Sequence, residues 1–196
     1  MARPAIALAM MGGLVDHAFT PAQLDRLAAA GELVDPVPLD AFDGDRAAAA
    51  LARAEVIVGH WGCPTLTGEV LTAAPNLRLF AYAAGTVKWQ VTDAVWARDL
   101  VVTSAAAANA VPVAEYTVAM LLLAGKGVLL FREWLRDPQL RLPLDPSTVG
   151  NYRRRIGLVG ASLVGRRVIE LLSPYDFELA VYDPFLSAAD AAQLGV

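Results

Sequence analysis

A short run of small residues between an apolar segment and a helix-like segment carries the clearest chemical signal in the sequence. Its members are Gly160, Ala161, Ser162, Leu163, Val164 and Gly165. The glycine at the start permits a tight turn, and the glycine at the end permits close packing of a helix on the preceding strand. The amide N–H groups of a helix N-terminus then face an anion. Ser162 stands where a glycine is usual, and its hydroxyl can donate to a phosphate. The pattern predicts a diphosphate-binding turn.

An acidic residue ends the next apolar run, over residues 179–182. Asp183 lies near the spacing of about 20 residues that separates such an acid from a dinucleotide-binding turn. A carboxylate there accepts hydrogen bonds from ribose hydroxyls and repels a 2′-phosphate, so the pair predicts NAD rather than NADP. The alternative is a glycine-containing turn in an unrelated α/β sheet, with Asp183-Pro184 only ending a strand.

Apolar and helical patterns alternate along the rest of the chain. Strands are predicted over 5–10, 33–37, 56–58, 77–82 and 100–103, with helices over 21–30, 45–54, 66–74 and 92–98. The last segment predicts strand 155–159, helix 164–172, strand 178–182 and helix 187–194. Strands separated by helices of this length predict βαβ units and a parallel sheet. The continuous apolar runs predict strands that are buried on both faces.

A long apolar segment lies between these two parts. Pro112 fits the first turn of a helix over 112–135, whose apolar side chains occupy all faces. Such a helix is expected to be buried between lobes or between subunits. Glu115 and Lys126 interrupt the run, so no membrane span is predicted. The following segment, 138–150, is rich in proline and polar residues and predicts a loop.

Composition limits the class of protein. The chain has 196 residues, 56% of them hydrophobic, and a formal net charge of −4, which predicts a packed α/β protein. The negative charge gives no electrostatic reason to expect nucleic acid or an anionic membrane as a partner. The single cysteine, Cys63, allows no intramolecular disulfide and favours a reducing, cytoplasmic compartment. We predict no metal site.

Together these segments resemble the N-terminal part of the D-isomer-specific 2-hydroxyacid dehydrogenases. The loop 83–87, the segment 109–115, and the nucleotide turn with Tyr182-Asp183-Pro184 match in the order of that family. The resemblance implies an α/β fold. A flavodoxin-like substrate lobe with a parallel sheet would occupy 1–104, an interlobe helix and linker 105–150, and the first half of a Rossmann NAD-binding domain 151–196. It also implies hydride transfer between NAD and a small 2-hydroxy or 2-oxo acid, and a homodimer through the 112–135 helix.

The same resemblance implies which residues lie near the cofactor and the substrate. NAD would contact the six residues of the turn, Asp183 and Pro184, and the substrate would lie near Ala84, Gly85, Thr86 and Trp61. For His60 and Lys88, packing or surface roles are the alternatives to substrate contact.

The family's catalytic Arg, Glu and His match no position of this chain. We therefore predict no catalytic residue here, a chain that is unfinished at its C-terminus, and no turnover by the chain alone. A non-catalytic NAD-sensing or corepressor-like binding module is the main alternative. An S-adenosylmethionine-dependent methyltransferase would also use such a turn and acid, but it fits the preceding segments poorly.

Overall fold

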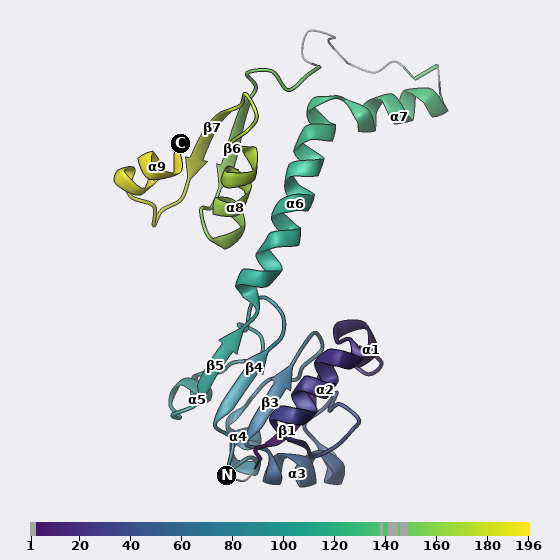
Figure 1. The fold of residues 1–196 in the computed structure, drawn as a ribbon, viewed down its shortest axis with the longest axis vertical. Coiled ribbons are helices and arrows are strands. Elements are labelled where there is room, and N and C mark those ends of the chain that lie inside the picture. Colours follow the sequence, from purple (N-terminus) through teal and green to yellow (C-terminus); the bar gives the residue numbers. More distant parts are fainter. Residues whose placement is uncertain (1–2, 138, 141–144, 146–148) are drawn as a thin grey trace. The chain divides into compact units, whose positions relative to one another are not determined.

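The chain divides into two compact units, one up to Ala106 and the other from Ala107. The structure is a computed structural model that describes residues 3–137, 139–140, 145 and 149–196. Figure 1 shows the elements of each unit along the chain. The three-part division at residues 104 and 150 stays a prediction about the roles of these segments.

The first unit is built on a five-stranded sheet. Its strands are β1 (Ala5–Ala9), β2 (Glu32–Leu33), β3 (Val56–Gly59), β4 (Leu79–Tyr82) and β5 (Val101–Ser104). All neighbouring strands pair in parallel, in the order β2-β1-β3-β4-β5. This is the flavodoxin-like strand order, in which ligands bind beyond the carboxyl ends of the strands. The predicted α/β fold with a parallel, flavodoxin-like sheet is confirmed.

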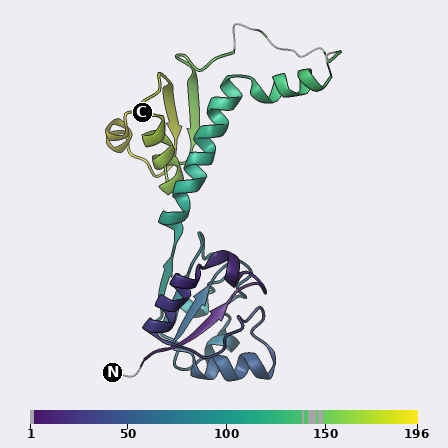
Figure 2. The ribbon, with the colours of Figure 1, turned by 45° about the vertical axis from the view of Figure 1, so that its right-hand side comes forward.

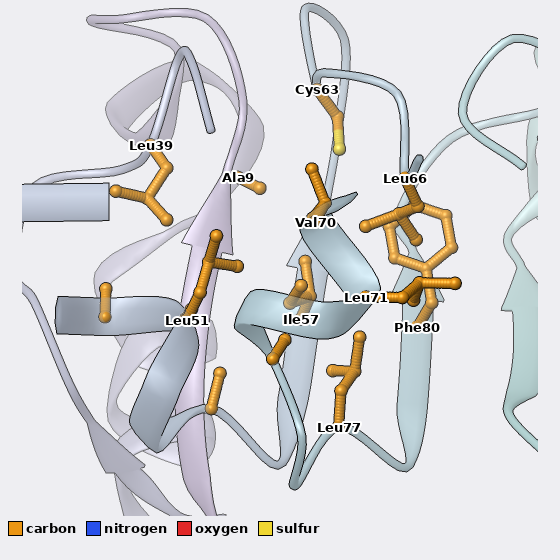
Figure 3. Packing of buried hydrophobic residues seen from close by; sticks show 14 of the residues in the cluster. Ala9, Leu39, Leu51, Ile57, Cys63, Leu66, Val70, Leu71, Leu77 and Phe80 are labelled. Carbon is orange, nitrogen blue, oxygen red and sulfur yellow. The ribbon is translucent and has the colours of Figure 1, made fainter. Parts of the chain in front are cut away.

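Helices cover both faces of this sheet. They are α1 (Val15–Ala18), α2 (Pro21–Ala30), α3 (Gly44–Arg53), α4 (Gly68–Ala73) and α5 (Asp93–Trp96). One face packs against α3, α4 and α5 in the larger core, where Leu51, Ile57 and Phe80 are fully buried (Figure 3). The other face presents Ile6, Leu8 and related side chains to α1 and α2. Successive strand residues therefore point into different cores, as the pleat requires.

The second strand is shorter than predicted. It was expected over 33–37, but β2 covers only Glu32–Leu33. The carboxylate of Asp35 accepts a hydrogen bond from the amide of Val37 at 2.8 Å, and this local turn replaces sheet pairing. Pro36 has no N–H group to donate to a ladder. Helix α1 was not among the predicted helices.

The second unit combines two helices with a small sheet. Its elements are α6 (Ala106–Gly125), which begins at the boundary between the units, α7 (Val128–Arg136), β6 (Arg155–Val159), α8 (Leu163–Leu172), β7 (Glu178–Tyr182) and α9 (Ala188–Leu194). Strands β6 and β7 pair in parallel over five residue pairs. This strand, helix, strand, helix order matches the predicted first half of a Rossmann domain.

Helix α6 packs on the small sheet and its helix. Ala114 and Val118 of α6 form one buried cluster with Val168 and Leu172 of α8, and β6 and β7 add partly buried side chains. The ribbon in Figure 2 shows α6 running alongside these elements. The small sheet therefore has one face covered by helices of the same unit.

Two expectations for the long helix are wrong. The predicted helix over 112–135 is two helices, because Gly127 adopts a left-handed conformation with φ +67° between α6 and α7. Pro112 lies inside α6 rather than in its first turn. Within the described chain Tyr116 of α6 is 67% exposed, and burial of this helix between lobes or between subunits stays a prediction. By length and composition alone α6 could cross a membrane, a test that core helices of soluble proteins also pass.

Burial of the strands on both faces holds in only part of the molecule. Strands β1 and β3 are largely buried, but β6 and β7 alternate between partly buried and exposed residues. Val159 is 88% exposed, at the end of the face opposite the α6 and α8 cluster. The described residues place no helix against that face.

Candidate functional site

The turn between β6 and α8 has the geometry that its glycines predict. Gly160 has φ +98°, in the region that favours glycine. Its amide donates to the carbonyl of Tyr182 at 2.8 Å, which ties the end of β6 to the end of β7. A Cβ built on Gly165 would overlap the carbonyl oxygen of Gly160. Both glycines are therefore required by the backbone path itself.

The N-terminus of α8 is left open by the residues around it. Ser162 occupies the N-cap position, yet its side chain accepts no hydrogen bond from the helix. The first backbone bond into the helix is that from the amide of Arg166 to the carbonyl of Ser162. Within the described chain, the amides of Leu163, Val164 and Gly165 have no acceptor. These three donors and the helix dipole together favour an anion in front of the helix.

Asp183 closes the opposite side of this turn. One carboxylate oxygen accepts from the amide of Ala161 at 2.6 Å, and the other accepts from the amide of Phe185 at 2.8 Å. Hydrogen bonds from the amides of Ala161 and Phe185 lower the pKa of the Asp183 carboxyl. Burial opposes them, and the nearby charge of Arg166 adds to the lowering. The side chain is therefore ionised at neutral pH and still has lone pairs for a ligand.

A pocket of about 180 Å³ lies between the turn and the segment after β7. It is lined by Ala161, Ser162, Arg166, Asp183, Phe185 and Leu186. The guanidinium of Arg166 folds back over the turn, and its Nε donates to the carbonyl of Ala161 at 2.8 Å. A cation and a carboxylate therefore stand in one pocket beside an open helix N-terminus.

The carboxyl ends of β3 and β4 meet in the first unit. The amide of Ala83 donates to the carbonyl of Gly59 at 2.7 Å, which brings the loops after these two strands together. Trp61 is 59% exposed, and its amide donates to Nδ1 of His60 at 2.7 Å. Burial lowers the pKa of the His60 imidazole. His60 accepts this hydrogen bond through Nδ1, and its ring packs against Phe19 and Trp61.

Comparisons with known proteins show what the chain is similar to. No protein-family model matches the chain. The chain is 30% identical over 170 residues to a D-3-phosphoglycerate dehydrogenase of Mycobacterium bovis, covering 87% of this chain and 32% of that protein. Its fold is similar to a phosphoglycerate oxidoreductase from Rhizobium etli, with a TM-score of 0.72, 23% identity, and coverage of 99% of this chain and 60% of that one. It is also similar to a D-lactate dehydrogenase from Aquifex aeolicus complexed with NAD and lactic acid, with a TM-score of 0.63, 19% identity, and coverage of 96% and 54%.

The chain is similar in sequence and in fold to D-2-hydroxyacid dehydrogenases. It spans about a third of the length of the curated relatives it matches, a share that fits their N-terminal portion. The resemblance read from the sequence is confirmed at the level of the family.

The residues of the predicted cofactor set differ in where the structure places them. Ala161, Ser162 and Asp183 line the pocket, whereas Pro184 does not. Leu163 is exposed. Val164 points into the cluster shared with α6, so it can offer a ligand only its amide. Gly165 allows the turn and α8 to pack closely, and its amide is open to a ligand.

Sequence reasoning missed Arg166 as a member of the pocket. The available signal was its position one helical turn after Ser162, from which a long side chain reaches back toward the N-terminus of its helix. Phe185 and Leu186 were also missed, because nothing in their types marks them as pocket residues.

The substrate set predicted from the family resemblance is only partly exposed. Ala84 is buried, Gly85 is partly buried, and Thr86 is exposed on the loop after β4. The hydroxyl of Thr86 accepts from the amide of Lys88 at 3.4 Å, so it braces this loop. Cys63 is buried, which raises the pKa of its thiol to about 12 and leaves it unsuited to act as a nucleophile.

Proposed function

We propose that the chain forms the substrate lobe and part of the NAD site of a dehydrogenase that oxidises the CH–OH group of a small 2-hydroxy acid. The open N-terminus of α8 beside Asp183 carries this proposal. A βα turn with three unpaired amides, a close-packed glycine and an ionised acid after the next strand fits a dinucleotide at each of its polar groups. Bound NAD would supply the carbon that accepts the hydride.

The residues of this chain would bind and orient that cofactor. The amides of Leu163, Val164 and Gly165 would donate to the diphosphate, where the positive end of the helix dipole adds to the attraction. The carboxylate of Asp183 would accept hydrogen bonds from the hydroxyls of the adenosine ribose. Because this carboxyl is ionised, it would repel a 2′-phosphate, so NAD is favoured over NADP.

We propose that the substrate binds beyond the carboxyl ends of β3 and β4. The backbone and hydroxyl at Ala84, Gly85 and Thr86 would face its carboxylate, and Trp61 would contact its carbon chain. Relatives bear names of phosphoglycerate, glyoxylate and lactate enzymes, so the proposal is limited to small 2-hydroxy and 2-oxo acids.

We also propose a cytoplasmic homodimer. The 112–135 segment carries exposed apolar side chains on both of its helices, among them Tyr116, Leu123 and Trp134. Burial of such a surface against a second copy would remove it from water. Sedimentation analysis measures this directly, and a monomer at all concentrations would contradict the dimer.

Titration with NADH tests the cofactor site. The Asp183→Ala variant is expected to weaken NADH binding by about tenfold or more, because hydrogen bonds to a charged acceptor are lost. Fluorescence of the bound nicotinamide gives the dissociation constant. Glu178→Gln is the matched control, since this acid lies at the other end of β7 and pairs with Arg155 at the surface.

The outcomes separate the parts of the proposal. Absence of NADH binding by the wild-type chain would refute the function, and equal affinities would refute the role of Asp183. We expect no turnover by the 196 residues alone, because no residue here is assigned to proton transfer. NADH oxidation with any 2-oxo acid by this chain would contradict that expectation. In the non-catalytic alternative, NADH would bind and full-length protein would still show no turnover.

A further inference from the structure

Arg166 stands at an electrostatically unusual place. It lies in the first turn of α8, at the positive end of the helix dipole, where a cation is disfavoured and an anion is favoured. The residue is exposed, but its Nε donates to the carbonyl of Ala161, on the turn in front of the helix.

This anchoring fixes where the rest of the guanidinium lies. Across the described residues, the two terminal nitrogens of Arg166 have no hydrogen-bond acceptor and no ion pair. The neighbouring Arg167 differs, since its NH1 pairs with Glu170 at 2.6 Å. Arg166 is also the only cation among the residues that line the pocket with Asp183. The terminal nitrogens are therefore available to a group that enters this pocket.

The charges around the pocket indicate what that group is. The open amides, the helix dipole and Arg166 are all positive toward the space in front of α8. Asp183 is the one anion lining the pocket, and its two oxygens are already tied to the amides of Ala161 and Phe185. A phosphate at the Asp183 side would meet repulsion, whereas one in front of α8 would meet the open amides and the guanidinium of Arg166.

From this geometry we propose that Arg166 binds the diphosphate of the dinucleotide. Its terminal nitrogens would donate to the phosphate oxygens together with the open amides of α8. The inference rests on the proposed NAD site and deepens it by assigning the cation of that site. Arg166 is a binding residue in this role, and the bond to Ala161 orients its guanidinium before the ligand arrives. A planar guanidinium presents paired donors that match two oxygens of a phosphate.

Binding of NADH and of adenosine to variants of the whole chain tests the assignment. Arg166→Gln is expected to weaken NADH binding by about tenfold, the effect of losing a charge-assisted hydrogen bond. Adenosine, which has no phosphate, should bind Arg166→Gln and wild type alike. Arg166→Lys should recover part of the NADH affinity, since it restores the charge without the paired donors. Arg167→Gln is the matched control and should bind NADH as wild type does.

Thermal unfolding and circular dichroism establish that each variant is folded before titration. Unchanged NADH affinity in Arg166→Gln, with NADH binding intact in wild type, overturns this inference alone. So does an equal loss in Arg166→Gln and Arg167→Gln, which would indicate a general effect of charge. An equal loss of adenosine and NADH affinity would place Arg166 at the adenosine and also overturn it. Failure of wild type to bind NADH overturns the proposed function, and the inference with it.

Discussion

Two helices of the second unit begin after a serine, and the two serines are used in opposite ways. Ser187 caps α9, because its hydroxyl accepts from the amide of Asp190 at 3.1 Å and donates to the Asp190 carboxylate at 2.7 Å. Ser162 precedes α8 and makes no such bond. A polar side chain three positions later is not required for a cap, because Thr67 caps α4 by accepting from the amide of Val70. At α9 the carboxylate of Asp190 also accepts from the Ser187 hydroxyl, and Gly165 offers Ser162 no such partner.

The N-terminus of α8 is open to the ligand that we propose, whereas that of α9 is capped. Gly165 cannot be replaced by a capping acid, since any Cβ would overlap the carbonyl of Gly160. The tight packing of the turn thus excludes at α8 the acidic partner that the capping serine of α9 has. At α9 the amides of the first turn are partly satisfied within the chain. The type of the N-cap residue alone does not distinguish a capped helix N-terminus from one whose amides stay open.

Substitution of Gly165 should have the largest effect on stability. We expect Gly165→Ala to destabilise the second unit by about 1–3 kcal/mol, the usual cost of overpacking. The change in urea midpoint measures it. Gly157→Ala is the matched control in β6, where a Cβ meets nothing within 4 Å. Equal midpoints for Gly165→Ala and wild type would contradict the close approach of turn and helix.

Removal of each serine hydroxyl should show whether the N-termini of α8 and α9 differ in their contribution to stability. Ser187→Ala should cost about 1 kcal/mol through loss of the cap. Ser162→Ala should change stability little, because no cap is present to lose. The same unfolding experiment compares both. A cost at Ser162 that matches the cost at Ser187 would mean that the two helix ends are alike.

The smallest expected effect is the pH dependence of the stability that ionised Asp183 contributes. Bonds from the amides of Ala161 and Phe185 keep the pKa of Asp183 below its ordinary value of 3.8. The ionised form therefore adds stability above that ordinary value, and this contribution is lost as the pH falls through the lowered pKa. The difference in Tm between wild type and Asp183→Asn should be constant above about pH 5 and narrow below about pH 4. A Tm difference that is unchanged at about pH 2 would contradict a stabilising role for the ionised carboxylate.

Local chemistry explains what the sequence could and could not predict. The alternation of apolar runs placed most strands and helices correctly, because burial on a pleated sheet imposes that pattern. The turn and Asp183 were found because their spacing follows from the strand and helix that connect them. The break at Gly127 was missed, since the apolar pattern continues across it. Arg166 was missed because its role depends on a side-chain conformation that folds back on Ala161.

The two backbone hydrogen bonds to Asp183 have a further consequence for ligand binding. They join the loop after β6 to the loop after β7, so both are held in place before any ligand arrives. A ligand at this edge meets a preorganised cradle, and little conformational entropy is left to lose on binding. Association should then proceed without a slow ordering step, and affinity differences between variants should appear mainly in the rate of dissociation.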